Sequence, residues 1–179
     1  RHFFIDGCAE VLKYGAIADE GLFSLLEEPL VAQDPRLKEV IRRCVEIKRD
    51  IVQEDEFEQG RRQLLNFGHT LGHAIEKCSN FEITHGYAVA CGMALVVRAC
   101  SMRGLCDESI ADRLFAALRS YGFSCETEFN SSLLYQAALS DKKRKGDSIS
   151  VVLVRGIGNA FCESFDLEEF CRFVADACD

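Results

Sequence analysis

Helical periodicity runs through most of this 179-residue chain, and no proline interrupts it after residue 35. The only two prolines are Pro29 and Pro35, and Pro35 follows Asp34 in the order of cap and first-turn proline that begins many helices. Apolar residues recur at spacings of three and four, which is typical of helices with one buried face. The predicted helices cover residues 6–18, 20–28, 34–52, 58–79, 84–103, 107–121, 131–140 and 166–177.

The pattern changes near the end of the chain. The run SISVVLVR (148–155) is rich in β-branched residues, GIGN is a turn sequence, and AFCESF (160–165) can return as a second strand. The sequence shows no βαβ pattern and no GxGxxG loop, so no motif in it predicts dinucleotide binding. We therefore predict a mainly α fold with one late β-hairpin, and we expect residues 1–179 to form a single helical domain.

Composition narrows the classes of partner. The formal net charge of −8 argues against a broad nucleic-acid surface. The longest apolar stretch, around residues 87–97, is too short to span a bilayer, so no membrane partner is expected. Ten cysteines without a CxxC pair favour reduced, buried thiols in a cytoplasmic protein over a disulfide framework. The start, RHFFIDG, reads as the middle of a longer protein.

The stretch LLNFGHTLGHAIE (64–76) carries His69 and His73 four residues apart. On a helix such a pair lies one turn apart, and both side chains can reach one metal ion. His85 begins the next predicted helix and is a candidate third ligand, as catalytic zinc sites use three. Because zinc proteases carry HExxH and this segment reads HTLGH, a pair of hydrogen-bonded surface histidines is the alternative.

Four polar residues stand four, three and four positions apart: Arg62, Asn66, His69 and His73. On one continuous helix they would share a single stripe, and Glu58, one turn earlier, would point along it. A guanidinium, an amide and two imidazoles differ from the mixed charges of an ordinary solvated face. We therefore interpret this stripe as the lining of a site.

Three further features have two readings each. Lys48 lies inside the apolar stripe of the predicted helix 34–52, where it either extends to the helix edge or lines a polar cleft. Glu10 and Lys13 form either a surface ion pair or a metal carboxylate beside a substrate-binding ammonium. The basic cluster DKKRKG (141–146) is either an exposed turn or a site for phosphate or carboxylate.

Four segments, in order along the chain, resemble the C-terminal domain of 3-dehydroquinate synthases: GCAEVLKYGAI (7–17), IKRDIVQEDEFEQGRRQLLNFGHTLGHAIE (47–76), HGYAVACGM (85–93) and DKKRKGDSISVVLVRGIG (141–158). The resemblance implies the helical C-terminal domain of the dehydroquinate synthase-like fold, with the NAD-binding N-terminal α/β domain absent from this chain. It also implies a cytoplasmic, homodimeric lyase that depends on NAD and on zinc or cobalt. That enzyme converts the sugar phosphate 3-deoxy-arabino-heptulosonate 7-phosphate to 3-dehydroquinate and phosphate, in the shikimate pathway to chorismate and the aromatic amino acids.

The resemblance also implies roles for individual residues. The metal ligands would be Glu10, His69 and His85. His73 and Glu58 would handle protons or organise water. The substrate would be held by Lys13, Lys48, Arg62 and Asn66, and by one of the two lysines Lys142 and Lys143. Tyr87 departs from the family pattern, which often has Glu two residues after the last histidine ligand.

Three other functions share parts of this pattern. Another sugar-phosphate cyclase, such as a 2-deoxy-scyllo-inosose synthase, would share the metal ligands. A metal-dependent polyol dehydrogenase related to glycerol dehydrogenase shares the two-domain plan but does not need the basic cluster. A helical domain with a purely structural metal would have a closed, four-ligand site. As a 3-dehydroquinate synthase portion without the NAD-binding half, this chain alone is expected to be inactive.

Gly68 and Gly72 each stand directly before a histidine of the HTLGH segment. A glycine inside a helix costs about 1 kcal/mol relative to alanine, so two of them need a reason. We interpret both as positions where this helix approaches a neighbouring helix closely.

Overall fold

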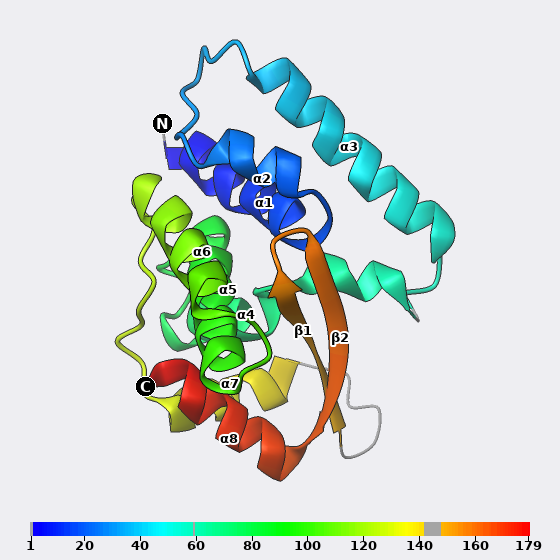
Figure 1. The fold of residues 1–179 in the computed structure, drawn as a ribbon. Helices are drawn as coiled ribbons and strands as arrows, with labels where there is room; N and C mark the ends of the chain where they lie inside the picture. The colour runs from blue at the N-terminus through cyan, green and yellow to red at the C-terminus, as the bar shows by residue number, and fades with distance from the viewer. Residues whose placement is uncertain (1, 59, 142–147) are drawn as a thin grey trace.

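The computed structural model describes residues 2–58, 60–141 and 148–179 (Figure 1). It confirms a mainly α chain with one late hairpin. The elements are α1 (His2–Ala18), α2 (Glu20–Leu26), α3 (Leu37–Glu54), the 3₁₀ helix η1 (Arg61–Asn66), α4 (His69–Cys78), α5 (His85–Met102), α6 (Glu108–Ser120), α7 (Ser131–Asp141), β1 (Ser148–Gly156), β2 (Asn159–Asp166) and α8 (Leu167–Cys178).

Helix α5 is the centre of the core. It packs against α1, α4, α6 and α8, and nearly every residue from Gly86 to Cys100 is buried. By length and composition α5 is apolar enough to cross a membrane, but 72% of it is buried inside the molecule. Its hydropathy is thus accounted for by contacts with other helices of the same chain.

The hairpin pairs β1 and β2 in antiparallel register, with Ile149 opposite Phe165 and Val152 opposite Cys162. Residues Val151–Val154 of β1 are buried, whereas most of β2 is partly or fully exposed. A left-handed residue, Gly158 at φ 78°, closes the turn. The hairpin packs on α1, α5 and α8, and so it extends the helical core (Figure 1).

The predicted continuous helix over 58–79 is wrong. The chain forms η1, then turns at Phe67 and Gly68, and only then begins α4. Gly68 has a left-handed backbone at φ 77°, and a Cβ atom there would lie 2.7 Å from the carbonyl oxygen of Val89 in α5. The break therefore comes from contact with another helix, which periodicity within the segment does not reveal.

The predicted start of the first helix at residue 6 is also wrong. Helix α1 already runs at His2, so Asp6 lies within it. Its carboxylate instead accepts hydrogen bonds from the Thr84 hydroxyl and, at 3.3 Å, from the backbone N–H of Tyr87. Asp6 thus caps the N-terminus of α5 from a neighbouring helix.

None of the ten cysteines, all of which lie in the described residues, forms a disulfide, and six of them are buried. Burial raises the pKa of the Cys91 thiol to about 12 and that of Cys8 to about 11. A thiol with such a raised pKa stays protonated and unreactive near neutral pH. The structure thus agrees with the prediction of reduced, mostly buried cysteines.

Candidate metal centre

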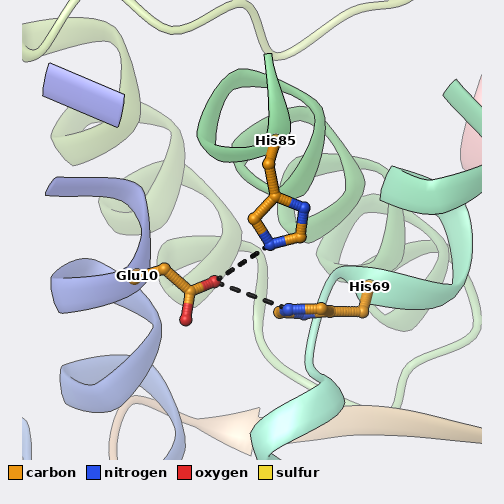
Figure 2. Close-up of side chains that lie close together, drawn as sticks. All are labelled: Glu10, His69 and His85. Carbon is orange, nitrogen blue, oxygen red and sulfur yellow. Dashed lines mark ion pairs between the residues drawn. The ribbon is translucent and has the colours of Figure 1, made fainter. Parts of the chain in front are cut away.

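Three elements bring Glu10, His69 and His85 together (Figure 2). Glu10 comes from α1, while each histidine is the first residue of its helix, α4 or α5. Oε1 of Glu10 lies 3.5 Å from Nε2 of His69 and 3.9 Å from Nε2 of His85. Ligands of a tetrahedral zinc ion stand about 3.4 Å apart, given bond lengths of about 2.1 Å, so the spacing suits one divalent ion.

The Glu10 carboxylate is only half satisfied. Its Oε2 accepts a hydrogen bond from Nζ of Lys13 at 2.6 Å. Within the described part of the chain, its Oε1 is fully buried and has no hydrogen-bond partner. A buried acceptor without a partner is destabilising by about 1–3 kcal/mol, and this cost would be removed by a cation bound between Glu10 and the two imidazoles.

The His69 imidazole is held in a form that can bind a cation. Its Nδ1 lies 3.1 Å from the carbonyl oxygen of Phe67, which can only accept, so Nδ1 donates and the Nε2 lone pair faces Glu10. Burial, followed by the charge of Lys13, lowers the pKa of His69 to about 4. His69 is therefore neutral at physiological pH, which is the state that ligates metals.

Close backbone contact sets the distance between α4 and α5. A Cβ on Gly72 would lie 3.1 Å from the carbonyl oxygen of Ala88, and one on Gly92 would lie 2.1 Å from the carbonyl oxygen of Gly68. The interpretation of Gly68 and Gly72 as close-approach positions agrees with these contacts, although Gly68 precedes α4 rather than lying inside it. The contribution of Gly92 was not predicted from the sequence.

A similar contact places α1 against the start of α5. A Cβ on Gly86 would lie 2.1 Å from the carbonyl oxygen of Asp6, so only glycine allows the two backbones to approach this closely. Asp6 lies one turn before Glu10, and Gly86 directly follows His85. The Asp6–Gly86 contact therefore fixes two of the three candidate ligands relative to each other.

The structure places His73 and Lys13 beside the ligand set. The His73 ring centroid lies 5.4 Å from that of His69 and 5.9 Å from that of His85. Lys13 is only 3% exposed, so of the two readings of the Glu10–Lys13 pair the surface ion pair is wrong. Burial lowers the pKa of Lys13, an effect that the ion pair with Glu10 opposes and the charge of Lys48 increases.

Three other predicted substrate residues are less buried than Lys13. Lys48 is exposed on α3. Nδ2 of Asn66 donates to Oε1 of Glu58 at 2.8 Å, and Nη1 of Arg62 donates to the carbonyl oxygen of Glu56 at 2.7 Å. Because η1 and α4 are separate, Arg62 and Asn66 do not continue the histidine stripe as a single helix. The lysines of the predicted basic cluster, Lys142 and Lys143 among them, lie outside the described residues.

Tyr87 packs its ring edge-on against Phe123, with centroids 4.9 Å apart. Although Tyr87 stands where the family pattern often has Glu, an acidic residue does lie near His85, namely Glu76 of α4. Both carboxylate oxygens of Glu76 lie 3.3–3.4 Å from Nδ1 of His85. No sequence signal predicts this contact beyond the position of Glu76 one turn after His73.

Comparison with known proteins decides the family. The protein-family model described as 3-dehydroquinate synthase C-terminal matches residues 7–144 of this chain. The chain belongs to this family. It is 39% identical over 174 residues to the 3-dehydroquinate synthase of Clostridium beijerinckii, and 38% identical over 175 residues to that of Streptococcus sanguinis. Each alignment covers 95% of this chain but only 50% and 49% of the relative, so this family member spans about half the length of these curated relatives.

Solved structures of related cyclases share the fold. The 2-epi-5-epi-valiolone synthase ValA from Streptomyces hygroscopicus, with NAD+ and Zn2+ bound, superposes with a TM-score of 0.84 at 29% identity, over 97% of this chain and 49% of that one. A 2-deoxy-scyllo-inosose synthase complexed with carbaglucose-6-phosphate, NAD+ and Co2+ gives a TM-score of 0.80 over 96% of this chain and 52% of that one. At 22% identity the second likeness concerns the fold alone. Together they confirm the predicted dehydroquinate synthase-like fold.

Proposed function

We propose that the chain is the metal- and substrate-binding half of a 3-dehydroquinate synthase. The observation that carries the proposal is the convergence of Glu10, His69 and His85, with one buried carboxylate oxygen left without a hydrogen-bond partner, in a chain of this family. The reaction is the conversion of 3-deoxy-arabino-heptulosonate 7-phosphate to 3-dehydroquinate with loss of phosphate, which makes the enzyme a lyase of the shikimate pathway. The expected setting is the cytoplasm.

Glu10, His69 and His85 would hold a zinc or cobalt ion. When bound, such an ion supplies Lewis-acid polarisation of a substrate hydroxyl. Because Oε2 of Glu10 is hydrogen-bonded to Lys13, the three side chains would each supply one ligand atom, which leaves a coordination position for a substrate oxygen. This arrangement differs from the closed, four-ligand site expected for a structural metal.

The remaining residues would bind and orient the substrate. Lys13 lies buried beside the ligand set, where an ammonium binds an anionic group more strongly than in water. Lys48, Arg62, Asn66 and one of Lys142 and Lys143 would contribute further donors for carboxylate, hydroxyl and phosphate oxygens. The His73 imidazole would accept or donate protons. Glu58, whose carboxylate accepts a hydrogen bond from Asn66, would assist in proton transfer or in organising water.

NAD would be bound mainly by the half of the enzyme that this chain does not include. The solved relatives named above contain NAD+, and the sequence here has no dinucleotide motif. The chain alone should therefore release no phosphate from the substrate. From the family resemblance, the complete enzyme is expected to be a homodimer. A sugar-phosphate cyclase of different specificity is the second candidate, because the two solved structures named above superpose closely on this chain.

A chimera tests the proposal. This chain would replace the corresponding half of the Clostridium beijerinckii enzyme, and phosphate release and 3-dehydroquinate would be measured. We expect turnover with 3-deoxy-arabino-heptulosonate 7-phosphate, and at least a 100-fold loss, of about the size seen on removing an electrostatic catalytic group, in the His69→Ala chimera. A folded chimera that binds NAD and metal but converts only a hexose 6-phosphate would establish the second candidate instead.

A further inference from the structure

His85 is the most exposed of the three candidate ligands. Its side chain is 44% exposed, compared with 14% for His69 and 33% for Glu10. It is also the first residue of α5, where the helix has no preceding turn to restrict the side chain. An exposed imidazole at such a position can rotate freely unless another group holds it.

Carboxylates face both nitrogens of this ring. Nε2 is directed towards Glu10, as Figure 2 shows, at 3.9 Å from Oε1. Nδ1 lies 3.3 Å and 3.4 Å from the two carboxylate oxygens of Glu76. The Glu76 side chain is only 15% exposed and belongs to α4, the helix that begins with His69.

We propose that Glu76 is a positioning residue for the metal centre. Its carboxylate accepts the Nδ1–H of His85, and this directs the Nε2 lone pair towards the ion shared with Glu10 and His69. The inference rests on the proposed metal centre. A neutral imidazole carries one N–H, and the partner of one nitrogen decides which nitrogen is left to bind the metal.

The arrangement at His69 supports this assignment. There the carbonyl oxygen of Phe67 accepts from Nδ1 and leaves Nε2 towards Glu10. Each histidine of the site thus has an acceptor on Nδ1 and turns Nε2 to the same carboxylate. The acceptor at His69 is backbone, fixed by the chain fold, whereas at His85 it is a side chain that can be substituted without altering the backbone.

A different arrangement would use Glu76 as a ligand. Single donor atoms of His73, Glu76 and His85 lie within 4.8 Å of one another and could hold a second ion. Such an ion would need the Nδ1 lone pair of His85. A neutral imidazole that binds the first ion through Nε2 carries its proton on Nδ1, so that lone pair is not free. The positioning role is therefore the one that the geometry favours.

Cobalt binding to the 179-residue chain tests the proposal. Affinity, stoichiometry and the visible Co2+ spectrum would be measured for the wild type, Glu76→Ala and Glu76→Gln. We expect one equivalent in the wild type and about 10- to 100-fold weaker binding, with an altered spectrum, in Glu76→Ala. Glu76→Gln should recover much of the affinity, because its amide oxygen still accepts from Nδ1. The matched control is Glu82→Ala, which removes an exposed carboxylate between the same two helices and should change affinity less than about twofold.

A second measurement does not need the metal. Nitrogen-15 NMR of the metal-free chain at alkaline pH reports which imidazole nitrogen of His85 carries the proton. We expect the Nδ1–H form in the wild type and a mixture of both forms in Glu76→Ala.

Two results would overturn the positioning role while leaving the metal centre intact. One is a Glu76→Ala chain that binds cobalt with wild-type affinity. The other is a wild type that binds two equivalents of cobalt when Glu76→Ala binds only one. A wild type that binds no cobalt would contradict the proposed metal centre itself. A His85 tautomer insensitive to Glu76 would then overturn this inference too.

Discussion

The helices that carry Glu10, His69 and His85 touch one another backbone to backbone. The 55–58 and 60–66 stretches before α4 instead combine apolar packing of Leu64 and Leu65 on the core with hydrogen bonds among their own polar groups. Among the ligand helices (α1, α4 and α5), glycines stand where any side chain would collide with a neighbouring backbone. In the 55–66 segment, the Asp55 carboxylate accepts from the backbone N–H groups of Gly60 and Arg62, at 2.8 Å and 3.0 Å. Both regions carry predicted site residues, but they are positioned by different kinds of contact.

The two regions should therefore differ in how well they tolerate substitutions. The ligand helices cannot shift without breaking close packing, so the spacing of the candidate ligands depends on the whole core. The polar side chains of the 55–66 segment make a few hydrogen bonds, most of them exposed and each worth about 1 kcal/mol. Substitutions at the helix contacts should therefore affect both stability and metal binding, while substitutions of these exposed polar side chains should affect neither strongly.

The largest effect is expected for Gly92→Ala. The added Cβ would lie 2.1 Å from the carbonyl oxygen of Gly68, so α4 and α5 must move apart. We expect a loss of about 3 kcal/mol in the free energy of unfolding, at the upper end for overpacking, measured by urea denaturation. Gly7→Ala is the matched control, because a Cβ there meets no atom within 4 Å and should stabilise α1 by up to about 1 kcal/mol. Equal stability of the two variants would contradict the role of backbone contact.

A smaller effect is expected for Asp6→Ala. This change removes the carboxylate that accepts from the Thr84 hydroxyl and the Tyr87 N–H at the start of α5. Loss of a capping group costs about 1 kcal/mol, which thermal or urea unfolding would detect. Asp6→Asn keeps an acceptor and should lose less. If both variants unfold as the wild type does, Asp6 does not cap α5.

The smallest effect is expected for Asn66→Ala in the 55–66 segment. It removes the hydrogen bond to the exposed Glu58 carboxylate, so the free energy of unfolding should change by no more than about 0.5 kcal/mol. Cobalt affinity should stay at the wild-type value, because no ligand helix is touched. A fall in stability comparable to that of Asp6→Ala would show that the two regions are not independent.

Local pattern predicted most of the fold. Periodicity located the helices and the hairpin because each of these elements repeats its own spacing. It missed the break at Phe67–Gly68, since the reason for that break is the Val89 carbonyl on another helix. It also did not predict that Asp6 caps α5, since the donors that Asp6 serves lie about eighty residues later in the chain.

The candidate site was predicted unevenly for the same reason. The resemblance named Glu10, His69 and His85, whose ligand atoms the structure brings within 4.8 Å of one another. The spacing of Glu10 and Lys13 does not decide whether this ion pair lies on the surface or is buried, because burial depends on packing between elements. Glu76 looks like any helical acid in sequence, and only the fold places it beside Nδ1 of His85.

Metal content of the purified chain tests whether Glu10, His69 and His85 together bind a divalent ion. The comparison would include the wild type, Glu10→Ala, His69→Ala, His85→Ala and His73→Ala, each checked for folding. We expect one equivalent of zinc or cobalt in the wild type, retained in His73→Ala and lost in the three ligand variants. Metal retained in full by His69→Ala, or lost only in His73→Ala, would contradict it.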